Sequence, residues 1–363
     1  QDPLLEAPVS DLTILEVTGD AATVGAAHGQ QFGEDIRAYL EKRRTLSLEG
    51  TDLEAAGVTA IAEDMIDAHL AYDDALFDEM AAMAAAAGIS PAEAIIVGGY
   101  TDFIDTVRAV AHGTAVEDQC TAVITPDHLS GGSGYLAQTW DMHASATPHV
   151  FLLDVKVGDA PRALVFTTHG TIGQIGLNEA GIAIGINNLT VSDGQHGVTW
   201  PFVVRRALKE TTFEGALAAI TEAPLAGGHN FLLLDAEGNG ASIEATPTRT
   251  YVESLGDAAL AHTNHCVVTD TQGVEGARPE DLQENSLTRL AQATELLGET
   301  AEHTADSLIA LLRDERSICR HPEPPHDYES SGAVIMRPAH GDFWACWGVP
   351  SVNEFHRFSV PRG

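Results

Sequence analysis

The spacing of apolar residues divides the chain into a helical part and a part rich in strands. Alternating apolar positions at 12–17 predict a short strand, and a long helix is expected to follow it. Helices are predicted to dominate as far as about residue 112. One of them, at 74–87, has apolar residues at helical spacing and ends at Gly88, a good C-cap. The residues Ser-Pro-Ala-Glu at 90–93 form a capping box that starts the next helix.

From residue 120 onward the pattern changes to short strands separated by turn signals. Strands are predicted at 120–125, 134–140, 150–157, 162–168, 172–177, 182–187, 230–235, 241–245 and 250–252, and helices at 201–209 and 212–223. The rest is predicted as a loop at 270–285, helices at 285–297 and 304–313, a proline-rich loop at 321–326, and a hairpin of strands at 332–337 and 343–348. Helical blocks that flank two runs of strands predict an α+β fold with two packed sheets between helical layers.

Composition and charge narrow the class of protein. The chain has 363 residues with 44% apolar content, enough for a large core. Fifty-three acidic residues against nineteen basic ones give a formal charge of -34, which argues against a nucleic acid partner. This charge fits either adaptation to a salt-rich cytoplasm or an acidic protein from an alanine-rich proteome.

The sequence also bears on the compartment of the protein. No apolar run approaches the roughly 20 residues of a membrane helix, so no membrane association is expected. The first residues lack the features of a secretion signal, although a chain that starts at Gln1 leaves room for an upstream segment. Four scattered cysteines at 120, 266, 319 and 346 predict thiols in a cytoplasmic protein.

Cys120 stands where a polar loop gives way to an apolar strand, at the boundary between the two parts of the chain. If the chain were cut before it, this residue would carry both a thiol nucleophile and a free α-amine that serves as the general base. A lone cysteine is also typical of a small buried apolar residue. Two polar clusters at predicted element ends, 262–266 and 317–320, favour a functional site.

A metal site at His262, His265 and Cys266 is the alternative interpretation of the first cluster. No matching carboxylate or cysteine pair accompanies these residues, and alternate residues of a strand point to opposite faces. We therefore expect neither a metal nor a cofactor.

Four strings in this order and spacing resemble the isopenicillin N acyltransferase (acyl-CoA:6-aminopenicillanic acid acyltransferase) family of N-terminal nucleophile hydrolases. They are Asp-Gln-Cys-Thr at 118–121, Trp-Asp at 140–141, His-Thr-Asn-His-Cys at 262–266 and Ser-Ile-Cys-Arg at 317–320. The resemblance implies a four-layer αββα sandwich. It also implies a precursor that cuts itself between Gln119 and Cys120, giving pieces 1–119 and 120–363 that stay associated as a heterodimer within one domain.

The resemblance also implies roles for individual residues. Cys120 would attack an acyl carbonyl, Asp141 would hold its α-amine, and Asn264 would donate a hydrogen bond to the oxyanion. Arg320 would orient a carboxylate, either that of Asp141 or one on the substrate. Weaker candidates for substrate binding are Thr121, Trp140, Glu244 and Ser317. The structural alternatives are that Asp141 caps a turn, Asn264 bridges backbone groups and Arg320 forms a surface ion pair.

The expected function is hydrolysis of amide bonds in small N-acyl compounds through a Cys120 thioester. Acyl-CoA-dependent acyl transfer is an alternative, because an amine can replace water as the acceptor. Two positions depart from the family pattern: Gln119 stands where glycine is usual before the nucleophile, and Ala122 where a second hydroxyl residue is common. An uncleaved binding protein of the same fold is therefore a further alternative. An oligomer larger than the heterodimer is left open.

Overall fold

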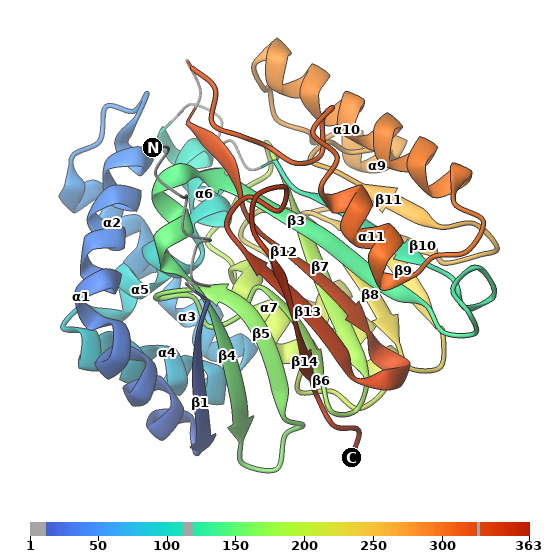
Figure 1. The fold of residues 1–363 in the computed structure, drawn as a ribbon. Helices are drawn as coiled ribbons and strands as arrows, with labels where there is room; N and C mark the ends of the chain where they lie inside the picture. Colours follow the sequence, from blue (N-terminus) through green and yellow to red (C-terminus); the bar gives the residue numbers. More distant parts are fainter. Residues whose placement is uncertain (1–11, 112–118, 325–326) are drawn as a thin grey trace, which may run out of the picture.

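The predicted four-layer αββα sandwich is confirmed in the computed structural model, which describes residues 12–111, 119–324 and 327–363. Two sheets pack face to face, and helices cover the outer face of each (Figure 1). The predicted cut between Gln119 and Cys120 lies directly before a strand that begins at Thr121, next to residues 112–118, which lie outside the described residues.

The larger sheet has eight strands in the described residues, and neighbours along it are antiparallel except for the first pair. In sheet order the strands are β1 (Thr13–Gly19), β4 (Val150–Val157), β5 (Ala163–Thr168), β6 (Ile175–Asn178), β7 (Ile182–Leu189), β8 (Gly228–Asp235), β9 (Gly240–Ala245) and β10 (Thr250–Ser254). β1 lies at the sheet edge and pairs in parallel with β4, from Thr13 opposite Phe151 to Gly19 opposite Val157.

The smaller sheet has six strands in the described residues, and all its pairs are antiparallel. In sheet order the strands are β11 (Leu260–His262), β2 (Thr121–Thr125), β3 (Tyr135–His143), β12 (Tyr328–Arg337), β13 (Asp342–Trp347) and β14 (Phe355–Ser359). The strand that follows Cys120 therefore lies between the edge strand β11 and β3.

The helices form two outer groups. The first group contains α1 (Ala21–Leu48), α2 (Ala55–Asp64), α3 (Ile66–Tyr72), α4 (Asp74–Ala87), α5 (Pro91–Gly98), α6 (Tyr100–Ala111), α7 (Trp200–Ala207) and α8 (Phe213–Thr221). The second contains α10 (Glu280–Glu299) and α11 (Ala305–Leu312), and the short α9 (Thr269–Gln272) precedes it. Figure 1 shows α1 to α6 and the α10 and α11 pair on opposite sides of the molecule.

Alternating residues of the small sheet separate its two faces. Val123 and Ala137 join α10 and α11 in one apolar cluster, together with Leu297 and Leu311. Their neighbours in sequence belong to the main cluster between the two sheets, which also reaches the first helical group. This alternation follows from the two-residue period of a strand, so each face of β2 and β3 has its own packing partner.

Helix α1 packs very closely against α4. A Cβ atom at Gly25 would lie 1.9 Å from the carbonyl oxygen of Glu79, and one at Gly29 would lie 2.3 Å from that of Met83. Only glycine allows the two backbones to approach this far. Gly25 and Gly29 of α1 are therefore explained by helix packing.

Most predicted elements are present, and several details are corrected. The predicted loop at 270–285 contains α9, and α10 begins at Glu280 rather than near residue 285. The predicted final hairpin is extended by β14, which pairs with β13. The capping box at Ser90 and the αL cap at Gly88 both form as predicted. Part of the proline-rich loop at 321–326 lies outside the described residues.

No single helix among the described residues is long and apolar enough to cross a membrane. Helices α4 and α5 together pass that test of length and composition, but they are bent by 101° relative to each other.

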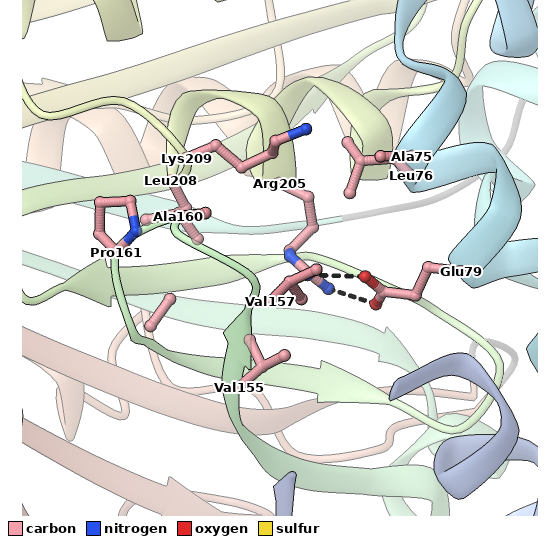
Figure 2. A pocket seen from close by; sticks show the side chains of 11 residues that line it. Ala75, Leu76, Glu79, Val155, Val157, Ala160, Pro161, Arg205, Leu208 and Lys209 are labelled. Atoms are coloured by element: carbon pink, nitrogen blue, oxygen red, sulfur yellow. Dashed lines mark hydrogen bonds and ion pairs between the residues drawn. The ribbon is translucent and has the colours of Figure 1, made fainter. Parts of the chain in front are cut away.

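A buried ion pair connects α7 to α4 and lies beside a small cavity. Arg205 of α7 donates two hydrogen bonds to the carboxylate of Glu79 on α4, at 2.7 and 2.9 Å (Figure 2). Both side chains are almost fully buried, and Arg205 also donates to the carbonyl oxygen of Ile172 at 2.8 Å. The cavity beside them holds about 20 Å³, room for about one water molecule, so it is too small for a substrate.

We expect Arg205→Met to lower the free energy of unfolding by about 3–5 kcal/mol, because it leaves the carboxylate of Glu79 buried without its partner. The matched control is Arg206→Met on the same helix. Arg206 is 40% exposed and its ion pairs with Asp73 and Glu210 are both 3.4 Å long, so its loss should cost less than about 1 kcal/mol. Urea unfolding of the two variants measures the difference, and equal losses would contradict a special role for the buried pair.

Candidate active site

The strand pairing brings three of the predicted catalytic residues, Cys120, Asp141 and Asn264, to one end of the small sheet. His262 of β11 lies opposite Ala122, and Thr139 of β3 lies opposite Thr121. Continuing both registers places Asn264 on one side of Cys120 and the Trp140–Asp141 pair on the other. The backbone N–H of Gln119 donates to the carbonyl oxygen of Asp141 at 3.3 Å, as this register requires.

Both residues of the predicted cut are completely buried. Gln119 and Cys120 have no exposed surface, and neither atom of the Gln119 side-chain amide has a hydrogen-bond partner among the described residues. In the continuous chain, therefore, a substrate cannot reach the thiol of Cys120.

Arg289 of α10 contacts the backbone of Cys120 from the outer face of the sheet. Its guanidinium donates to the carbonyl oxygen of Cys120, to Oγ1 of Thr121 at 3.1 Å and to Oδ1 of Asn264 at 3.0 Å. Its Nε donates to Oδ1 of Asn285, one turn earlier on the same helix, at 2.7 Å. One fully buried cation thus contacts the candidate nucleophile and the candidate oxyanion residue together.

The charge of Arg289 is maintained despite its burial. Burial lowers the pKa of Arg289 to about 10, and the neighbouring Asp141 and Cys120 oppose this fall. A guanidinium with that pKa remains protonated at neutral pH. The site therefore contains a fixed positive charge next to the position where a negative charge would develop in acyl transfer.

Contacts from α10 and from the large sheet fix the orientation of the Asn264 side chain. A guanidinium can only donate, so the Asn264 atom that faces Arg289 must be the oxygen. The amide nitrogen then faces the other way and donates to the carbonyl oxygen of Asn188, on β7 of the large sheet, at 3.0 Å. This bond uses one of the two hydrogens of the amide. The backbone N–H of Asn264 donates to Oγ of Ser286 on α10 at 2.9 Å.

Asp141 and Arg320 are linked through Ser330 of β12. The hydroxyl of Ser330 donates to Oδ1 of Asp141 at 2.7 Å and accepts from the backbone N–H of Arg320 at 2.9 Å. Asp141 is fully buried, whereas Arg320 is partly exposed. The structure thus places the two residues at neighbouring positions but connects them through the backbone of Arg320.

The carboxylate of Glu244 is held by hydrogen bonds from other residues of the protein. Its carboxylate accepts hydrogen bonds from Nε2 of His262 and the backbone N–H of Val267, both at 2.7 Å, and from the hydroxyl of Thr271. Burial would raise the pKa of Glu244, but these bonds outweigh it and lower the pKa. Because Glu244 lies on β9, it ties the large sheet to the loop that carries Asn264.

The remaining candidates lie in three different environments. Thr121 is buried beneath Arg289, and Trp140 is buried in the main apolar cluster. Ser317 lines a polar surface pocket of about 420 Å³, and so do Arg320 and Asn285. Since Asn285 also contacts Arg289, this pocket is separated from Cys120 by one layer of side chains.

The other three cysteines are poor candidates for the nucleophile. Burial raises the pKa of Cys346 to about 12 and also raises the pKa values of Cys266 and Cys319. A thiol is reactive as the thiolate, which a raised pKa disfavours.

Sequence reasoning missed Arg289, although a signal was present. The buried positions of α10 are Leu282, Ser286, Arg289, Ala293 and Leu297, which follow one face of the helix. An arginine inside such a stripe has to be paired, because burying an isolated charge is very costly. Its position could therefore have indicated a polar site beneath the helix.

Most of the chain matches the model of a known protein family. Residues 129–351 match the family model described as acyl-coenzyme A:6-aminopenicillanic acid acyl-transferase. This range includes Asp141, Asn264, Arg289 and Arg320, and Cys120 lies just before it.

One curated relative is the acyl-coenzyme A:6-aminopenicillanic-acid-acyltransferase 40 kDa form of Emericella nidulans. It is 24% identical over 254 residues, which cover 67% of this chain and 66% of the relative, just under two thirds of its length.

Similar solved structures include a mutant of conjugated bile acid hydrolase from Clostridium perfringens. It has a TM-score of 0.44 and 10% identity, over 67% of this chain and 98% of that one. Penicillin V acylase from Agrobacterium tumefaciens has a TM-score of 0.37 and 11% identity, over 68% and 80%. The family model matches well over half of the chain, and the chain therefore belongs to the acyl-coenzyme A:6-aminopenicillanic acid acyl-transferase family.

Proposed function

We propose that the protein is a self-cleaving N-terminal cysteine hydrolase that breaks amide bonds of small N-acyl compounds through a thioester at Cys120. The observation that carries this proposal is the buried Arg289, which contacts both Cys120 and Asn264. Membership of an acyl-transferring family supports the reaction type.

The first step is maturation of the chain. Sγ of Cys120 attacks the carbonyl carbon of Gln119, a C–S bond forms as the C–N bond breaks, and the thiol proton moves to the departing amine. Water then hydrolyses the thioester, which leaves a carboxylate on Gln119 and both a thiol and a free α-amine on Cys120. One feature supports this step: the nucleophile is inaccessible in the continuous chain.

The mature site would then act on an external amide. The α-amine of Cys120 takes the thiol proton as Sγ attacks the acyl carbonyl, and later gives it to the leaving amine. Asp141, held by Ser330, stabilises the ammonium, while the amide nitrogen of Asn264 donates to the oxyanion. Arg289 acts as a positioning residue, because it holds the oxygen of the Asn264 amide and so directs its nitrogen away. Arg320 lines the polar pocket, where it can meet a charged group of the substrate.

Acyl transfer from acyl-CoA is the second candidate, and the family match favours it. Both reactions share the thioester and differ in the acceptor that resolves it. Supplying acyl-CoA with 6-aminopenicillanic acid or with water alone separates them, since transfer yields a new amide and hydrolysis yields only the free acid.

Maturation predicts two fragments in the purified protein. Denaturing mass spectrometry should find pieces corresponding to 1–119 and 120–363, and Cys120→Ala should remain a single chain because it lacks the attacking sulfur. The matched control Cys319→Ala, also a buried thiol, should still be cut. A single intact chain in the unmodified protein would rule out the proposed activity and favour the uncleaved binding protein.

Asn264→Ala should lower kcat for an N-acyl amide by roughly 100- to 1000-fold with little change in KM, because the oxyanion loses one donor. The control Asn239→Ala removes an asparagine whose hydrogen bonds, among the described residues, all go to Asp235 in the turn between β8 and β9. Amine release under steady-state conditions provides the measurement, with circular dichroism to establish folding. Equal kinetics in the two variants would exclude the oxyanion role.

Arg289→Met should slow maturation and turnover strongly, whereas Arg289→Lys should restore part of both, since it keeps a cation that can reach one acceptor. If Arg289 had a purely structural role, the Met and Lys variants would mature and turn over at equal rates whenever their thermal stability was equal. Arg316→Met, at an arginine that is 61% exposed, serves as the control. Equally slow maturation of the Met and Lys variants at matched stability would contradict the expected rescue by a cation at this position.

A further inference from the structure

A cluster of three metal-binding side chains lies outside the candidate active site. It consists of Asp35 on α1, His149 just before β4 and His169 just after β5. One ligand atom from each residue lies within 4.8 Å of the other two. The sequence predicted no metal, and these residues are too far apart along the chain for a recognisable motif.

The distances match those between ligands of one small cation. Nδ1 of His149 lies 3.3 Å from Nδ1 of His169, and the latter lies 3.5 Å from Oδ2 of Asp35. Tetrahedral zinc with bonds of about 2.0–2.2 Å separates its ligand atoms by about 3.3–3.5 Å. Two of the three separations therefore already have the required length. Asp35 is 55% exposed, so its carboxylate can move to adjust the third.

The two histidines are held in place by ring stacking and by a backbone hydrogen bond. The ring of His169 stacks on Phe32 at 4.0 Å, and the ring of His149 stacks on Tyr39 at 4.2 Å. The backbone N–H of His169 also donates to the carbonyl oxygen of His149 at 3.0 Å.

We propose that Asp35, His149 and His169 form a zinc site, with the fourth position taken by water on the exposed side of Asp35. Asp35 belongs to the segment before Cys120, and both histidines belong to the segment after it. If the chain is cut as proposed above, the metal connects the two pieces. This bridging role rests on the proposed cleavage, whereas zinc binding itself does not.

Calorimetric titration of the tag-free, chelator-treated protein with zinc chloride tests the site. One equivalent should bind, and Asp35→Asn should weaken binding at least tenfold. The matched control is Glu34→Gln, which makes the same charge change at the neighbouring exposed position of α1. Absence of binding, or equal binding by the two variants, would overturn the proposal. Asp35→Asn should still fold, because the side chain that it replaces is more than half exposed.

Cobalt(II) gives a second readout of the geometry. The protein with cobalt should show the intense visible absorption of a tetrahedral complex, and His149→Gln, verified as folded by circular dichroism, should lose it. Weak absorption typical of an octahedral ion, or absorption unchanged in His149→Gln, would contradict the assigned ligands.

The uncleaved Cys120→Ala variant separates this proposal from the proposed function. It should bind zinc as tightly as the cleaved protein, so zinc binding can be established even if cleavage fails. In the cleaved protein, a chelator should lower the urea concentration at which the two pieces separate, and Asp35→Asn should show no such response. An equal response in Asp35→Asn would exclude the bridge.

Discussion

The burial of one guanidinium constrains much of this structure. Arg289 has no exposed surface, and a buried cation is tolerated only when acceptors surround it. Those acceptors come from the residue at the proposed cut, from the strand after it, from the loop after β11 and from α10 itself. The helix therefore cannot shift along the small sheet without breaking several of these bonds.

Polar groups between the two sheets extend this constraint to the large sheet. Gln138 of β3 both donates to and accepts from the backbone of Ile186 on β7, at 3.0 and 2.8 Å. A Cβ atom at the neighbouring Gly185 would lie 2.4 Å from the oxygen of Gln138, so glycine is needed there. Glu244 makes the corresponding link on the other side of the site. Directional bonds of this kind fix the relative position of two sheets that apolar packing alone would leave free to slide.

Local patterns predicted local structure well. The caps at Gly88 and Ser90 and most strands follow from short-range rules that act within a few residues. The four-layer arrangement followed from the order of helices and strands and from the family resemblance. The start of α10 was missed because its first two residues, Glu280 and Asp281, are polar and exposed and the helix has no side-chain cap.

Long-range features could not be predicted in the same way. The parallel pairing of β1 with β4 joins residues more than a hundred positions apart, and no local pattern encodes that choice. The contact between Arg289 and Cys120 spans 169 positions and depends on where α10 crosses the sheet. Sequence did indicate that Cys120 and Asn264 lie at element ends, but only the register of β11 against β2 brings them to adjacent positions.

The position of β1 has a consequence for solubility. This strand is itself mostly exposed, and it pairs with the backbone hydrogen-bonding groups along the edge of β4. Without residues 12–111, β4 would present a full row of unpaired backbone groups, flanked by the apolar face that α1 and α4 now cover. Such an edge is a template for pairing between molecules, so the segment after Cys120, made alone, would be prone to assemble edge to edge into aggregates.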